Sequence, residues 1–250
     1  MSENYYSPQP QEPQGPAVEI TRNETLGRYT AKTFGIMFLG LLVTFAIAYY
    51  LSNTFSGYLL LYQVNSVVSL GTVQLILLVA ELVVVIAMSA MIQKMSPVAA
   101  TVCFFVYAIL TGLTFAPIFL VYHLSSLALV FGFTALYFGG MAVFGFFTSI
   151  DLSRIRTLLV GGLIFLIIAN VLMLFIPGLQ VADRVLCTIG VVIFLAYTAY
   201  DTQKIKTFYY GFQGDDAMLK KASVISALEL YLDFINLFLY LLRLFGKRKN

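Results

Sequence analysis

Four stretches of the sequence are long, apolar and free of charged residues. They comprise residues 34–52, 98–122, 124–150 and 157–182, and the shortest contains 19 residues. An α-helix needs about 20 mainly apolar residues to cross the hydrocarbon core of a lipid bilayer, which is about 30 Å thick. Stretches of this kind predict an all-α integral membrane protein with several membrane-spanning helices.

The overall composition supports the same class. Hydrophobic residues make up 60% of the chain and charged residues 11%, whereas a typical soluble domain carries about 25% charged residues. The net charge of +3 comes from basic residues in short connections, so binding to nucleic acid is not expected. The two cysteines, Cys103 and Cys187, lie inside apolar stretches, which favours buried apolar packing over a disulfide or a metal site. No cofactor is expected.

The chain is predicted to form one membrane domain over residues 26–250, preceded by a tail over residues 1–25. The tail is polar and rich in proline, and it has too little apolar surface to offset the entropy of ordering it, so we expect disorder there. The domain is predicted to contain seven membrane-embedded segments. They are expected at residues 34–52, 72–92, 98–122, 126–149, 157–177, 185–201 and 223–244. The charged connection over residues 202–222 is expected to be partly helical.

The distribution of Lys and Arg predicts the orientation, because short loops on the cytoplasmic side of a membrane carry an excess of these residues. With seven full crossings and the N-terminus inside, ten of the fifteen basic residues lie inside and five outside. If the last segment instead dips into the membrane and returns, the split becomes fourteen to one. Both arrangements place the N-terminus in the cytoplasm, and the side of the C-terminus stays open.

Two features indicate how the helices pack. Ala108, Gly112 and Ala116 recur at four-residue spacing, and small residues in this pattern let helix backbones approach closely in membranes. Asn170 lies inside an apolar stretch, where we expect it to form a hydrogen bond to a neighbouring helix.

Four acidic residues lie within or at the edge of the apolar segments: Glu81, Asp201, Glu229 and Asp233. An aspartate at the centre of a membrane helix costs about 2.5 to 3.5 kcal/mol on insertion scales, so such residues usually face a bundle interior or a wet cavity. Glu229, Asp233 and Asn236 have the spacing that places them on one helix face. A polar stripe with apolar residues around it predicts that the last helix occupies the centre of the bundle.

Asp201 ends the sixth segment, and a hairpin between the last two segments would bring it close to Asp233. Two buried carboxyl groups in contact are expected to share one proton and to titrate as a unit. Such a pair is suited to act as a proton-sensitive latch, and in its deprotonated form it offers oxygen ligands for Ca²⁺. In the simpler alternatives, Asp201 is a solvated helix-end residue paired with Lys204 or Lys206, and Glu81 is a protonated acid bonded to a neighbouring helix.

Five stretches of the sequence together point to a family. In chain order they are "ELVVVIAMSAMIQKMSP", "YAILTGLTFAPIFLVY", "FGGMAVFGFFTSIDLS", "AYTAYDTQKIK" and "LELYLDFINLFLYLLRLFG". The last two are the most specific. With them the sequence resembles the bacterial branch of the Bax inhibitor-1 family, also called the transmembrane Bax-inhibitor-motif family. The resemblance implies seven helices with the last one surrounded by the other six, and a pH-sensitive Ca²⁺ leak. It also implies that the sensor is an aspartate pair, here Asp201 in "YDTQ" and Asp233 in "YLDFINLF".

The sequence departs from this family at one position that matters for the sensor. Bacterial relatives commonly carry an arginine near the end of the second helix, where it latches onto the aspartate pair, and here Met91 stands at that position. Lys94 is a possible replacement if the end of the helix reaches the pair. An ammonium group lacks the forked geometry with which arginine holds two carboxylate oxygens.

The sequence therefore predicts a passive Ca²⁺ leak in a bacterial-type cytoplasmic (inner) membrane. The Asp201–Asp233 pair is the expected pH gate and candidate Ca²⁺ ligand. Glu229, Asn236 and Glu81 are candidates for lining its cavity or binding the ion. The expected partners are Ca²⁺, protons and the lipid bilayer, and a membrane protein partner of unknown identity is possible.

Other functions remain open from the sequence. The protein could regulate a membrane protease or channel and conduct nothing significant itself, or it could be a proton-coupled cation transporter. Intramembrane aspartyl proteases also place two aspartates on adjacent late helices, but their second aspartate follows a Gly-x-Gly. Here Leu230, Tyr231 and Leu232 precede Asp233. The only histidine, His123, belongs to no His-Glu-x-x-His motif, so we do not expect an enzyme.

Overall fold

The computed structural model describes residues 25–54, 67–175 and 183–249, with side chains from residue 76 onward in the second of these ranges. The predicted disordered tail, residues 1–25, lies outside the described residues except for Thr25.

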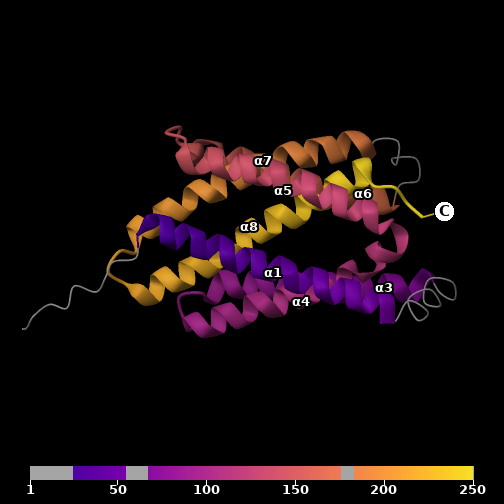
Figure 1. The fold of residues 1–250 in the computed structure, drawn as a ribbon, viewed down its shortest axis with the longest axis horizontal. Coiled ribbons are helices and arrows are strands. Elements are labelled where there is room, and N and C mark those ends of the chain that lie inside the picture. Colours follow the sequence, from indigo (N-terminus) through magenta and orange to yellow (C-terminus); the bar gives the residue numbers. More distant parts are fainter. Residues whose placement is uncertain (1–24, 55–66, 176–182, 250) are drawn as a thin grey trace, which may run out of the picture.

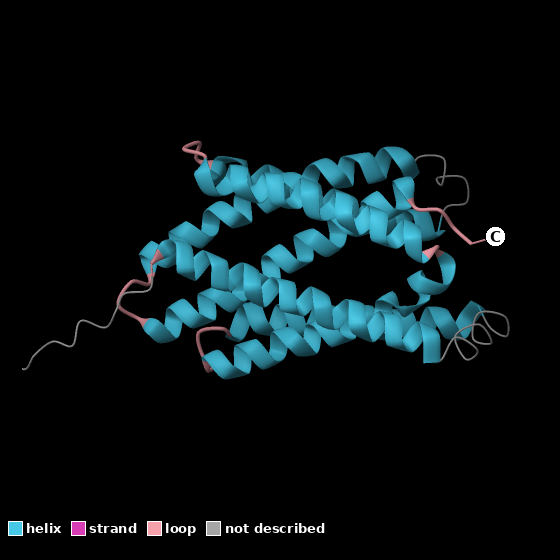
Figure 2. Ribbon diagram, viewed as in Figure 1, coloured by secondary structure: helices cyan, strands magenta, loops and turns pink. Residues whose placement is uncertain are grey.

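The described residues form seven α-helices that run along one long axis (Figure 1). They are α1 (Leu26–Thr54), α3 (Val67–Met91), α4 (Pro97–Val121), α5 (Leu124–Phe147), α6 (Arg156–Phe175), α7 (Asp183–Gly211) and α8 (Asp216–Phe245), with a short 3-10 helix, η1 (Leu152–Ile155), before α6. Six of these helical segments are long and apolar enough to cross a membrane, and the part of α3 whose side chains the structure describes, Ile76–Met91, is also apolar. Figure 2 shows only helices and loops in the described chain. The predicted all-α membrane fold is confirmed.

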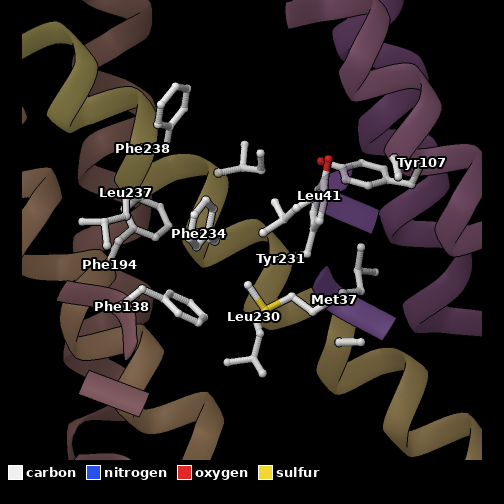
Figure 3. Packing of buried hydrophobic residues seen from close by; sticks show 14 of the residues in the cluster. Met37, Leu41, Tyr107, Phe138, Phe194, Leu230, Tyr231, Phe234, Leu237 and Phe238 are labelled. Atoms are coloured by element: carbon white, nitrogen blue, oxygen red, sulfur yellow. The ribbon is translucent and has the colours of Figure 1, made fainter. Parts of the chain in front are cut away.

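The last helix is the centre of the bundle, as predicted. In α8, 72% of the apolar span is buried, against 11% in the span that contains α6. It packs against α1, α4, α5 and α7. In Figure 3, Tyr231 points toward Leu41 and Tyr107 on one side of α8, while Phe234 lies on the side of Phe138. Aromatic side chains on both faces of α8 therefore fix its rotation within the bundle.

The connection over residues 202–222 was predicted to be partly helical, and this is confirmed. The helix α7 continues to Gly211 and α8 begins at Asp216, so most of the predicted connection over residues 202–222 is helix. Hydropathy marks the part of a helix that matches lipid, whereas the helix itself continues through polar residues as long as its backbone hydrogen bonds can form. The turn is closed by Gly214, which has a φ of 92°, and by Asp215, whose side chain accepts a hydrogen bond from the backbone N–H of Met218 at 2.9 Å.

The two predicted packing features are confirmed. Ala108, Gly112 and Ala116 are all buried, and the hydroxyl of Thr44 on α1 donates to the carbonyl oxygen of Ala108 at 2.8 Å. The side chain of Asn170 on α6 donates to the hydroxyl of Tyr240 on α8 at 3.1 Å. The same amide accepts a hydrogen bond from Arg243, which also forms an ion pair with Asp183 on α7. These contacts tie α6, α7 and α8 together at one end of the bundle.

The start of α1 and the end of α8 lie at opposite ends of the bundle (Figure 1). Near the start of α1, the hydroxyls of Thr33 and Ser223 are 2.8 Å apart, which places the start of α8 there as well. At the other end, Arg248 forms an isolated β-bridge with Tyr122 in the connection between α4 and α5. The helix α8 therefore runs the full length of the bundle and does not dip in and return.

A buried hydrogen bond of Tyr231 contributes to the stability of the bundle. Tyr231 is fully buried, and its hydroxyl lies 2.6 Å from the hydroxyl of Thr44. Because Thr44 already donates to Ala108, Tyr231 must be the donor in this bond. Tyr231→Phe is expected to lower the free energy of unfolding by about 1 kcal/mol, measured by thermal unfolding in detergent. Tyr50→Phe is the control, because Tyr50 is 62% exposed, and equal effects of the two changes would contradict the prediction.

Candidate functional site

The structure brings Asp201 on α7 and Asp233 on α8 together, as the sequence predicts. The two carboxyl groups line one cleft and lie close enough to interact, and the residues are only 6% and 4% exposed. Burial and a second negative charge both disfavour the ionised form of a carboxyl group, so two buried carboxyl groups in contact favour a shared proton. The pair is therefore suited to hold a proton between the last two helices, away from bulk water.

The rotation of α7 that points Asp201 toward α8 is fixed from the opposite side of that helix. Gln203 donates from Nε2 to the carbonyl oxygen of Ile150 at 2.7 Å and accepts from the backbone N–H of Leu152 at 2.9 Å. Lys206 donates to the carbonyl oxygen of Phe146 at 2.7 Å. These bonds fasten α7 to the end of α5 and to the connection that follows it. With that face occupied, the face of α7 that carries Asp201 is left to meet α8.

The carboxyl pair lies in the wall of a partly open cleft of about 290 Å³ between α6, α7 and α8. The volume is sufficient for several water molecules. The cleft is lined by Arg156, Val160, Leu163, Phe194, Tyr197, Tyr200, Asp201, Lys204, Glu229, Leu232, Asp233 and Asn236. A cleft with three carboxyl groups, an amide and two cationic side chains is suited to ions rather than to an apolar ligand.

A direct ion pair lies in the same cleft. The ammonium of Lys204 is 2.6 Å from Oε1 of Glu229, and about a quarter of each side chain is exposed. The same ammonium lies 5.2 Å from the ring centroid of Phe208, within cation–π range. Lys204 follows Asp201 by three residues and Glu229 precedes Asp233 by four. Since α7 and α8 are antiparallel, these offsets place the ion pair next to the carboxyl pair.

Two carboxylate oxygens in the cleft lack a hydrogen-bond partner among the described residues. They are Oε2 of Glu229 and Oδ2 of Asp233, and both are buried. A buried acceptor left unpaired is costly, so such atoms mark places where water or a cation would bind. The described residues contain no cluster of three or more His, Cys, Asp or Glu suited to hold a metal ion. A cation here would rely on two carboxyl groups and on water ligands, which favours transient over tight binding.

Of the other predicted residues, Glu229 and Asn236 line the cleft and Glu81 does not. The amide nitrogen of Asn236 donates to the carbonyl oxygen of Leu232 at 2.8 Å. The amide oxygen of Asn236 takes no part in this hydrogen bond. Glu81 on α3 accepts a hydrogen bond from the hydroxyl of Thr114 on α4 at 2.7 Å. That contact matches the simpler alternative for Glu81, a bond to a neighbouring helix.

The structure does not bring Lys94 to the carboxyl pair. Its side chain is exposed, and the neighbouring carbonyl of Gln93 accepts a hydrogen bond from Lys221 at the start of α8. Lys221 precedes Asp233 by twelve residues, which is about 18 Å along a helix and beyond the reach of a lysine side chain. Met91, the position at which the resemblance implied a latch arginine, is 51% exposed.

Sequence reasoning missed the cations that the cleft does contain. It considered Lys204 only as a partner for a solvated Asp201, whereas the structure pairs it with Glu229, and it gave Arg156 no role in the cleft. The available signal was the position of Lys204, three residues after Asp201 and therefore on the same helix face.

The fold and the cleft define a class: an all-helical integral membrane protein with two carboxyl groups buried together between its last two helices. Residues 26–250 match the family described as "Inhibitor of apoptosis-promoting Bax1". The chain belongs to this family, the Bax inhibitor-1 family, which confirms the resemblance seen in the sequence.

Bacterial relatives agree with this assignment. The inner membrane protein YbhL of Escherichia coli K12 is 41% identical over 225 residues, which covers 90% of this chain and 93% of YbhL. A protein of Borreliella burgdorferi is 37% identical over 225 residues, covering 89% of this chain and 93% of its own length. Protein RP147 of Rickettsia prowazekii is 36% identical over 230 residues, covering 92% and 94% of the two chains.

Proposed function

We propose that this protein is a pH-sensitive passive Ca²⁺ leak, gated by the protonation of the Asp201–Asp233 pair. The observation that carries the proposal is the burial of these two carboxyl groups in the wall of one cleft that is rich in oxygen ligands. The proposed activity is passive movement of an ion down its gradient and includes no catalysed reaction.

The direction of the pH dependence follows from electrostatics. With one proton shared, the pair carries a single negative charge, and its hydrogen bond holds α7 against α8. When that proton is lost, two like charges face each other in a poorly hydrated interior, and their repulsion favours separation of the helices and entry of water. The deprotonated pair also offers the hard oxygen ligands that Ca²⁺ prefers. The leak is therefore closed at acid pH and opens as the pH rises.

We place the protein in a bacterial cytoplasmic (inner) membrane, with its N-terminus in the cytoplasm. The name of the E. coli relative, inner membrane protein YbhL, supports the location. Of the fourteen Lys and Arg residues that the structure describes, nine lie toward the end of the bundle that holds the start of α1, and this excess supports the orientation. Because α8 runs the full length of the bundle, the C-terminal tail would lie on the opposite side of the membrane.

The test is Ca²⁺ flux through the purified full chain in liposomes, followed with an enclosed Ca²⁺ indicator from acid to alkaline pH. Asp201→Asn and Asp233→Asn each replace one acid by a neutral group of the same shape. Each variant is expected to keep the flux at its low acid-side level across the whole pH range. Asp216→Asn is the matched control, because Asp216 is exposed in the first turn of α8, and its pH profile should equal that of the unchanged protein.

The other outcomes identify the competing functions. If both aspartate variants follow the unchanged protein at every pH, the pair is not the sensor. If no preparation passes Ca²⁺ and a membrane protein is retained with the chain in a pull-down, the result favours a regulator of that partner. If the flux requires an opposing proton gradient, the protein is a proton-coupled transporter.

A further inference from the structure

A second cleft, of about 310 Å³, opens where α1, α4 and α8 diverge. It lies at the end of the bundle where these three helices begin, away from the carboxyl pair. Lys32 on α1 and Lys220 on α8 border it, and apolar side chains form its walls. A cleft that combines cationic groups with apolar walls is suited to an amphipathic anion, because it can bind both the charged group and the apolar part of such a ligand.

The two lysines are available to a ligand. Both side chains are exposed, and neither takes part in an ion pair within the described part of the chain. Asp216, one turn before Lys220, is also not paired with it in the structure. The adjacent Lys221, by contrast, is buried and bonded to the carbonyl oxygen of Gln93 at 3.0 Å. The positive charge at this cleft therefore has no partner among the described acids.

The walls of the cleft face the surroundings of the bundle. Val98 and Val102 on α4 are 73% and 56% exposed, and Ile36 and Val224 complete the apolar lining. Val102 is the sixth residue of α4, so it lies about 8 Å from the start of that helix. Lys32 and Lys220 also lie close to the starts of their own helices. At this depth we expect the lysines to meet lipid headgroups. The two valines would then lie next to the first part of the acyl chains.

We propose that this cleft binds one anionic phospholipid of the surrounding bilayer. The phosphate lies between Lys32 and Lys220, and the first part of an acyl chain lies on Val98 and Val102. Basic clefts between membrane helices on the cytoplasmic side bind anionic headgroups in this manner. The start of α4, with Pro97 in the lining, adds the positive end of a helix dipole. The inference does not depend on the proposed Ca²⁺ leak.

A fluorescence experiment tests the site directly, because the chain contains no tryptophan. Val102→Trp places a single reporter on the exposed wall of the cleft in the full chain. In nanodiscs, brominated phosphatidylglycerol, which is anionic, is expected to quench this tryptophan with an association constant about tenfold above that of brominated phosphatidylcholine. The preference should be lost with Lys32→Gln and Lys220→Gln together, and it should survive Lys32→Arg and Lys220→Arg.

The control reporter is Ile86→Trp on α3, at a matched exposure of 57% and a similar distance from the end of its helix. It should be quenched equally by both lipids. Native mass spectrometry provides a second readout, in which phosphatidylglycerol should stay bound to the unchanged protein and be lost from the double glutamine variant. Equal quenching at Val102→Trp, or a preference that survives the glutamine changes, would overturn the proposal. Displacement of the lipid by inorganic phosphate would overturn it in favour of a free-phosphate site.

Discussion

Gly145→Ala is expected to lower the free energy of unfolding by about 3 kcal/mol. A Cβ at this position on α5 would overlap the backbone carbonyl oxygen of Ala199 on α7 and lie 2.8 Å from its Cα. Because the obstacle is backbone and not the end of a flexible side chain, one whole helix must shift to make room. The expected loss is measured by denaturant or thermal unfolding of the purified protein in detergent.

The same helix provides the matched control. Gly140 on α5 has nothing within 4 Å of where a Cβ would lie, so Gly140→Ala should be neutral or stabilise the helix by up to about 1 kcal/mol. Ala199 precedes Asp201 by two residues, so the shift caused by Gly145→Ala should also disturb the carboxyl pair and alter the pH profile of Ca²⁺ flux. Equal stability of the two alanine variants would show that α5 and α7 are not held at this distance.

The contrast between Gly145 and Gly112 shows which part of the helix packing could be predicted from the sequence. Gly112 was identified because Ala108 and Ala116 flank it at four-residue spacing, and this small face does meet α1. Gly145 is not flanked in this way on both sides, because Met141 stands four residues before it, and it lies in a stretch with several other glycines. Only the placement of α7 against it distinguishes it from Gly140. The class of fold follows from local hydropathy, whereas the points of closest approach depend on which helices become neighbours.

The contacts of the candidate site also fall into those that the sequence predicts and those that depend on how the helices pack. The contact between Asp201 and Asp233 was predictable because both residues stand on consecutive helices joined as a hairpin. The ion pair of Lys204 with Glu229 depends on the register of that hairpin. The register is set by the short turn that Gly214 closes. Hydropathy did not locate this turn, because it marked all of residues 202–222 as a connection. Glu81 was grouped with the other membrane acids on composition alone, and its helix packs mainly against α4, away from the cleft.

Lys204→Met is expected to raise Ca²⁺ flux at neutral pH by about tenfold. The ammonium of Lys204 lies 2.6 Å from Glu229 in the cleft that holds the carboxyl pair, where it occupies a position suited to an incoming cation. Methionine fills similar space without charge, so the change leaves Glu229 unpaired and makes the cleft more negative by one charge. A cleft of one charge sign concentrates ions of the opposite sign, with effects of about tenfold or more on their entry. The measurement is initial Ca²⁺ flux in liposomes.

Two further variants separate this effect from a general loss of positive charge. Lys206→Met removes a lysine two residues away that bonds to the carbonyl oxygen of Phe146 and does not line the cleft, so its flux should stay unchanged. Adding Glu229→Gln to Lys204→Met removes the unpaired carboxylate and should return the flux toward that of the unchanged protein, as expected for two residues that act through one contact. If Lys204→Met and Lys206→Met behave alike, or if Glu229→Gln gives no recovery, the lysine does not compete with Ca²⁺ in the cleft. Recovery in the double variant would identify Lys204 as an internal cation that competes with Ca²⁺ for Glu229.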